Sequence, residues 1–127
     1  MSASTCDVSL GDYDGDSAEF YVESTMVARK VHVCYECRAE IQPGERYQRV
    51  VGKWDGEFSS HRFCLPCWEI SGEFSGDGGR TFGVVWEQFR DQWHDGSNLQ
   101  ACLNRVETVA AKTKLREQWQ RWKGIAP

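Results

Sequence analysis

The sequence lacks the signals of export and of membrane insertion. Its first residues contain no basic stretch followed by an apolar run, and acidic residues follow at Asp7, Asp12, Asp14 and Asp16. No apolar run approaches the roughly 20 residues that a transmembrane helix needs. We therefore expect no membrane association and a cytoplasmic location, where thiols stay reduced and paired cysteines more often bind metal than form disulfides.

Basic charge and catalytic motifs are also scarce. With 15 basic and 19 acidic residues, the net charge is −4, so the chain lacks the overall basic excess that nucleic-acid-binding proteins show. It contains no glycine-rich phosphate loop and no Ser-His-Asp arrangement. A nuclease of the HNH type needs His and Asn on the helix after its hairpin, and residues 65–76 contain neither. We expect the protein not to be an enzyme.

Cysteines and aromatic residues are well represented instead. Six Trp, six Phe and four Tyr give 13% aromatic residues in 127, which argues against disorder and for one folded domain or a small module with an appendage. The residue composition and pattern predict three parts: an acidic N-terminal lead-in (1–29), a zinc-binding module (30–76) and a C-terminal helical region (80–127) packed on or beside it.

Four cysteines form two pairs at metal-ligand spacing. Two residues separate Cys34 from Cys37, 26 residues follow, and two residues again separate Cys64 from Cys67. Two such pairs joined by a hairpin-sized segment predict tetrahedral Zn²⁺. Two disulfides, a thioredoxin-like redox pair and an iron–sulfur cluster are the alternatives. We expect the zinc to be structural, because four thiolates fill the tetrahedron and leave no position for water.

His61 offers a different fourth ligand. A set of Cys34, Cys37, His61 and Cys64 also has the spacing of a zinc site, and Cys67 would then be spare. We favour Cys67, because a C-x2-C pair at the start of a helix is sufficient by itself. His61 would then lie on a strand near a thiolate.

The predicted elements follow the order of a treble-clef finger. Residues 46–51 and 57–63 predict two strands joined by an Asp55-Gly56 turn. Pro66 suits the first turn of a helix that runs toward Gly72, and four glycines make 71–80 a flexible linker. In the lead-in only 19–22 resembles a strand. The fold class is α+β: a small treble-clef-like zinc finger (knuckle, β-hairpin, helix) and an α-helical tail.

Helical periodicity dominates the tail. An apolar stripe at three-and-four spacing predicts a helix that ends near His94, formed by Phe82, Val85, Trp86, Phe89 and Trp93. Ser97 and Gln100 form a capping-box signal for a second helix that continues to Trp122. Its apolar face comprises Leu99, Cys102, Leu103, Val106, Val109 and Ala110. We expect Cys102 to pack as a small apolar residue and Cys6 to be a free thiol.

Linked motifs run through about residues 19–70: Ala28-Arg29-Lys30-Val31-His32-Val33-Cys34-Tyr35-Glu36-Cys37, Ile41-x-Pro43-Gly44-Glu45-x-Tyr47, Gly52-Lys53-Trp54-Asp55-Gly56-Glu57-Phe58 and Cys64-Leu65-Pro66-Cys67. Together they resemble small phage and prophage zinc-finger proteins of unassigned function. The resemblance implies a viral origin and the cytoplasm of a bacterial host, but no activity. By analogy with small phage proteins that redirect host machinery, it implies a host protein partner, including an anti-CRISPR-like inhibition of host defence.

Two functional hypotheses follow. The first is a non-catalytic interaction protein, whose candidate anchors are Trp54, Phe58, Trp86, Trp93, Trp119 and Trp122, because tryptophan is enriched at interface hot spots. Alternatively the tryptophans bury one another within the tail or in a homodimer. The second hypothesis is nucleic-acid binding, for which basic residues interleave with aromatics on the hairpin and in the tail. These are Arg46, Arg49, Lys53, Arg62, Lys112, Lys114, Arg116, Arg121 and Lys123.

Overall fold

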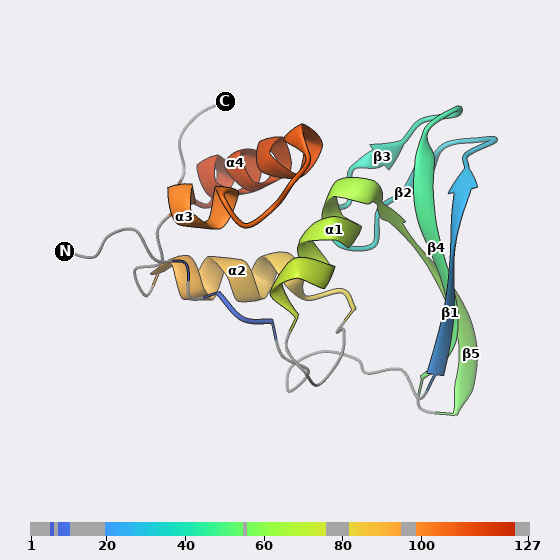
Figure 1. Cartoon of the computed structure of the whole chain (residues 1–127). Coiled ribbons are helices and arrows are strands. Elements are labelled where there is room, and N and C mark those ends of the chain that lie inside the picture. Colours follow the sequence, from blue (N-terminus) through green and yellow to red (C-terminus); the bar gives the residue numbers. More distant parts are fainter. Residues whose placement is uncertain are drawn as a thin grey trace.

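In the part of the chain that the structure describes, a small antiparallel sheet combines with four helices that all lie on one side of it (Figure 1). The computed structural model describes residues 6, 8–10, 20–54, 56–75, 82–94 and 99–123. The elements are β1 (Phe20–Val27), β2 (His32–Val33), β3 (Glu40–Ile41), β4 (Arg46–Trp54), β5 (Glu57–Cys64), α1 (Leu65–Phe74), α2 (Val85–His94), α3 (Leu99–Leu103) and α4 (Val109–Lys123). The α+β class is confirmed.

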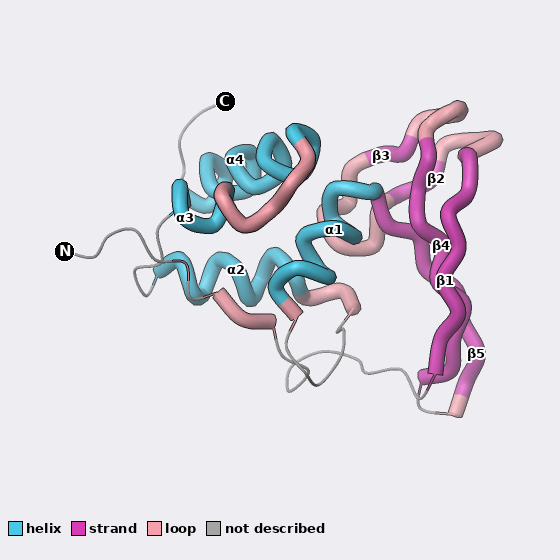
Figure 2. Tube along the Cα trace, viewed as in Figure 1, coloured by secondary structure: helices cyan, strands magenta, loops and turns pink. Residues whose placement is uncertain are grey.

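The main sheet has the order β1-β4-β5. The predicted hairpin is present: β4 and β5 pair from Tyr47 opposite Cys64 to Trp54 opposite Glu57, and Gly56 takes a φ of +82° in the turn. Asp55 lies outside the described residues. A separate two-stranded ribbon, β2 with β3, adjoins this sheet (Figure 2).

β1 is a full third strand, which the sequence indicated only at residues 19–22. It pairs along β4 from Phe20 opposite Lys53 to Val27 opposite Arg46. Most of its side chains are exposed, so it lacks the apolar alternation that reveals a half-buried strand. Gly52 permits the close approach, because a Cβ there would lie 2.7 Å from the Phe20 carbonyl oxygen.

α1 is longer than predicted, and residues 71–74 belong to it rather than to a linker. The Phe74 ring packs edge-on against Phe89 of α2 at 4.9 Å between centroids, and Ser71 is also buried. Burial of Phe74 therefore outweighs the weak helix propensity of Gly72. The rest of the predicted linker, 76–80, lies outside the described residues.

The predicted helix up to Trp122 is wrong as one element, because α3 and α4 are separate. Thr108 caps α4 by accepting a hydrogen bond from the Ala111 N–H at 3.1 Å. Glu69 of α1 reinforces this cap: its carboxylate accepts from the N–H groups of Glu107 (2.8 Å) and Thr108 (3.2 Å) and from the Thr108 hydroxyl. Ser97, the predicted cap, lies outside the described residues. Val109, predicted to be buried, is 77% exposed.

Two apolar cores result. The helical core lies among the helices and includes Ile70, Phe74, Val85, Phe89, Trp93, Leu103 and Leu115, together with Val8 and Leu10 from the N-terminal segment. The sheet core lies between the sheet and α1 and includes Ile41, Tyr47, Val50, Trp54, Phe63, Cys67 and Phe82. Trp86 packs against both cores. Among the described residues, no helix is both long and apolar enough to cross a bilayer.

Candidate metal centre

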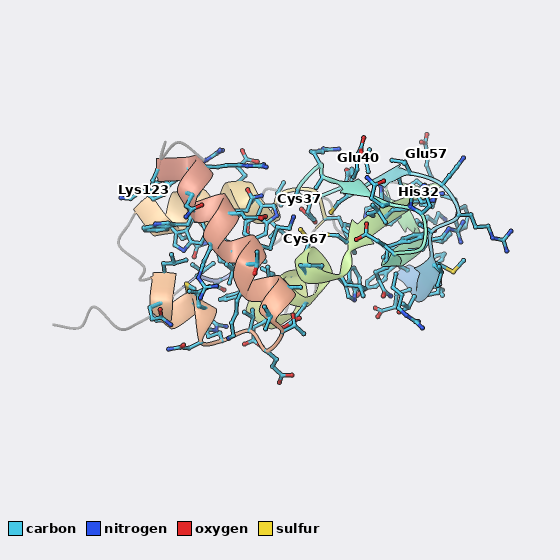
Figure 3. The ribbon with its side chains drawn as sticks, turned by 90° about the horizontal axis from the view of Figure 1, so that it is seen from above. His32, Cys37, Glu40, Glu57, Cys67 and Lys123 are labelled. Atoms are coloured by element: carbon cyan, nitrogen blue, oxygen red, sulfur yellow. A yellow bond between two sulfur atoms is a disulfide. The ribbon has the colours of Figure 1, made fainter. Side chains whose placement is uncertain are left out.

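The four paired cysteines converge on one point. The Sγ atoms of Cys34, Cys37, Cys64 and Cys67 all lie within 4.8 Å of one another. Figure 3 places Cys37 and Cys67 between the helices and the sheet. Four thiols in such a cluster can hold a metal ion, since thiolates are strong metal ligands.

The first pair lies on a tight turn between β2 and β3. The Arg38 N–H donates to the Cys34 carbonyl at 3.0 Å, and the Cys34 N–H donates to the Ala39 carbonyl at 2.9 Å. Arg38 takes a φ of +65°, a left-handed conformation that reverses the chain directly after Cys37. The turn thereby brings both side chains to the same side.

The second pair lies where β5 passes into α1. Cys64 is the last residue of β5 and the N-cap of α1, and Pro66 occupies the first turn of the helix, as predicted. Cys67 follows in the same turn and is fully buried. The N–H groups at a helix N-terminus stabilise negative charge, so this position suits side chains that become thiolates when they bind a cation.

Proximity and burial perturb the acidity of the four thiols. The Cys37 contact raises the pKa of Cys34, but the contacts with Cys64 and Cys67 lower it more, to about 7. The pKa of Cys67 is raised by its contacts with the other three thiols, Cys34 first, and by burial. Without metal, some of the four thiols therefore keep their protons, and a bound cation would displace these protons.

Two donors from the helical region contact the cluster. The Trp86 indole N–H of α2 donates to Cys67 Sγ at 3.3 Å, and the Lys114 ammonium of α4 donates to Cys37 Sγ at 3.4 Å. Burial lowers the pKa of Lys114, but the neighbouring thiolates raise it more, so the net shift is upward. Both donors offset negative charge on sulfur, and neither was predicted to lie at the site.

Glu36, between the first two cysteines in sequence, ties the turn to the start of α2. Its buried carboxylate accepts hydrogen bonds from the Gly83 N–H at 2.8 Å and the Val85 N–H at 3.1 Å. Burial raises its pKa, although these hydrogen bonds oppose the shift. Gly83 has a φ of +89°, and a Cβ there would lie 2.9 Å from the Tyr35 ring. The position therefore requires glycine.

His61, the alternative fourth ligand, is not part of the cluster. It lies on β5, stacked on Tyr35 with ring centroids 4.2 Å apart, and Trp54 contacts it edge-on at 5.0 Å. The structure thus brings Cys67, and not His61, to the other three cysteines.

The six proposed partner-binding residues differ in exposure. Trp54 and Trp93 are only 8% and 3% exposed and belong to the sheet core and the helical core, so most of each side chain is buried within the protein. Trp86, Trp119 and Trp122 are partly buried against the helical core. Only Phe58, at 69%, is well exposed. The spacing of aromatic residues on a helix face does not show whether they are buried or exposed, because large aromatic side chains occur both in cores and at interfaces.

Cys6 and Cys102 form a disulfide, which corrects the prediction that both are unpaired. They are 96 residues apart and belong to no local motif, so spacing gave no indication of the pair. The cause is tertiary. Val8 and Leu10 are buried in the helical core, and the Leu10 N–H donates to the Phe74 carbonyl at 2.9 Å, which places Cys6 beside α3.

Comparisons add no relative with which to interpret the site. The resemblance to phage zinc-finger proteins therefore stays a prediction. No protein-family model, curated protein or solved structure matches this chain.

Proposed function

We propose that the four cysteines hold a structural Zn²⁺ ion in a treble-clef-like finger, and that the protein acts by binding a partner rather than by catalysis. The main support for the zinc site is the convergence of four thiols. Zn–S bonds of about 2.3 Å imply sulfur–sulfur distances of about 3.8 Å in a tetrahedron. Cys37 Sγ and Cys64 Sγ are 3.9 Å apart, and all four sulfurs lie within 4.8 Å.

The surroundings support a structural ion. Four thiolates around Zn²⁺ leave a residual charge of about −2, since each ligand carries one negative charge. The Lys114 ammonium and the Trp86 indole N–H offset this charge from the helical side. The ion would thus hold the sheet core and the helical core together, and its binding free energy would contribute to folding.

Metal analysis tests this part of the proposal. Purified protein should contain about one equivalent of zinc and no iron absorption, and a strong chelator should reduce its near-ultraviolet circular dichroism and lower its melting temperature. Cys67→Ser should have the same effect, whereas His61→Ala should keep one equivalent of zinc. Loss of zinc in His61→Ala but not in Cys67→Ser would overturn the ligand set.

A pocket between α2 and α4 supports a protein partner. It has a volume of about 270 Å³ and is lined by Trp86, Arg90, Trp93, Gln118, Arg121 and Trp122. Small-molecule sites are usually about 300–1,000 Å³, so this pocket suits one side chain of a partner better than a cofactor. Trp and Arg are also the residues enriched at interface hot spots.

The charge of the pocket indicates what it would receive. Neither Arg90 nor Arg121 forms an ion pair with any residue in the described part of the chain. We therefore propose an acidic segment of a host protein as the occupant, in the cytoplasm of a bacterial host. Inhibition of a host defence system, in the manner of an anti-CRISPR protein, is the specific form of this proposal that the resemblance implies.

Charge reversal at the pocket tests the partner. Crosslinking in host extract followed by mass spectrometry should give crosslinks from one host protein to the α2–α4 pocket. Binding of that purified protein should be lost in Arg121→Glu and kept in Arg116→Glu, an equivalent change on an exposed part of the same helix. Equal binding by both variants would contradict the proposed site. Crosslinks only to a second copy would indicate a homodimer instead.

A further inference from the structure

One side of the main sheet faces away from the helices (Figure 1). In antiparallel strands, directly opposed residues share a face, and every second residue lies on it. The register therefore places three rows side by side, which we call the outer face: Phe20, Lys53 and Phe58; Val22, Val51 and Ser60; Ser24, Arg49 and Arg62.

The first row presents two exposed aromatic rings. Phe20 and Phe58 are 53% and 69% exposed, and their rings meet edge to face, with centroids 5.8 Å apart and planes inclined at 65°. Lys53 lies between them in register, with its Nζ 5.8 Å from the centre of the Phe58 ring. In the next row Val22 is 69% exposed. These apolar side chains remain in contact with water in the folded protein, so a partner that binds here can bury them.

All charge on the outer face is positive, although the whole chain carries −4. Lys53, Arg49 and Arg62 are its charged members, and no Asp or Glu is among its nine residues. Within the described residues none of these three cations forms an ion pair, and the Nε of Arg62 is buried without a hydrogen-bond partner. Glu23 and Glu57 lie on the opposite face by the same register.

We propose that the outer face binds single-stranded nucleic acid. The exposed faces of the phenylalanine rings would stack on bases, and Lys53, Arg49 and Arg62 would contact phosphates. From the first row to the third the face extends about 13 Å along the strands, at about 3.3 Å per residue, which suits a short stretch of nucleotides. Duplex DNA is disfavoured as the ligand, because its bases are already stacked and cannot lie flat on exposed rings.

An acidic protein segment is the competing ligand, but it matches only part of the surface. It would satisfy the three cations and leave the paired rings without planar partners. A single strand presents negative charge and π faces together, which are the two properties that the outer face complements. This inference concerns a different surface from the α2–α4 pocket, so either proposal can fail without the other.

Salt-dependent binding gives the quantitative test. Fluorescence anisotropy with labelled oligo-dT and oligo-U of about 12 nucleotides should detect binding that weakens with salt. Three phosphate contacts predict a slope of log K against log salt of about −2, which is an affinity loss of about 20-fold between about 50 and about 200 mM. Arg49→Ala should reduce the magnitude of the slope by about 0.7.

Substitutions separate stacking from charge. Phe58→Ala should weaken binding by about 5-fold to about 150-fold, whereas Val109→Ala, at a residue 77% exposed on α4, should have no effect. Arg116→Ala is the control for Arg49→Ala. Retained zinc content and circular dichroism would show that each variant is folded, as the exposure of Phe58 leads us to expect.

Several results would overturn the inference. These are absence of salt-dependent binding, binding of a matching DNA duplex as tightly as single strands, and full binding by Phe58→Ala and Arg49→Ala. Tighter binding of a poly-glutamate peptide than of either oligonucleotide, lost in the same two variants, would assign the outer face to a protein partner.

Discussion

Replacing Lys114 by Met should weaken zinc binding without unfolding the protein. The ammonium is 3.4 Å from Cys37 Sγ, and at an effective dielectric constant of about 20 that separation corresponds to about 5 kcal/mol of attraction per unit charge. Solvent screening and the hydration that lysine regains on removal offset much of this. Substitutions of residues that contact metal ligands typically lower affinity 10–100-fold, or about 1.4–2.7 kcal/mol, and we expect Lys114→Met to fall in that range.

Competition with a chromophoric zinc chelator would measure this affinity in wild type, Lys114→Met and Lys114→Arg. Arg116→Met is the matched control, because it removes the same charge two residues along α4 from an exposed position. The control should bind zinc like wild type, and Lys114→Arg should retain most of the affinity. Zinc binding by Lys114→Met within about threefold of wild type, or an equal loss of affinity in Arg116→Met, would refute a direct effect of the Lys114 ammonium.

Three further predictions concern the helical region and the protons of the metal site. Glu69→Gln should lower the free energy of unfolding by about 1–2 kcal/mol, because it removes a charged acceptor from the start of α4. Urea unfolding would measure this loss. The control Glu117→Gln, at an exposed position, should leave the free energy of unfolding unchanged. Although burial raises the pKa of Glu69, the hydrogen bonds lower it more, so its contribution is present at neutral pH and is lost as the pH falls through the lowered pKa. In protein purified without reductant, Cys6→Ala should lower the free energy of unfolding by about 2–5 kcal/mol, since the bridge to Cys102 spans 96 residues. Finding six rather than four reactive thiols in wild-type protein purified in this way, after denaturation and removal of metal, would show that no bridge exists. Zinc affinity should fall as the pH is lowered from about 8 to about 6, because the metal-bound cysteines are deprotonated and the metal-free cluster holds protons; affinity independent of pH in the chelator assay would contradict thiolate ligation.

Features set by short-range chemistry could be predicted from the sequence. The hairpin of β4 and β5 followed from Gly56 in its turn and from the strand propensities on either side. The start of α1 followed from Pro66, and the convergence of the cysteines from their spacing. In each case the signal lies within a few residues of the feature.

Features that depend on distant partners could not be predicted in this way. The interruption before α4 depends on Glu69 of α1, nearly 40 residues away, and the Cys6–Cys102 bridge on the burial of the N-terminal segment. Likewise Lys114 and Trp86 reach the cysteines only because α2 and α4 lie beside the segments that carry them. A single sequence shows which residues could make such contacts, but not which of them do.

The Glu36 carboxylate has a consequence for how the chain can be divided. It anchors the turn of the first cysteine pair to backbone N–H groups that belong to residues 83–85. A fragment ending at residue 76 would retain all four cysteines, yet Glu36 would be left without its two backbone donors. Such a fragment should therefore fold poorly even with zinc in excess. The smallest autonomous folding unit should thus extend at least into α2, and heat should unfold the cysteine-bearing segment and α2 in one transition.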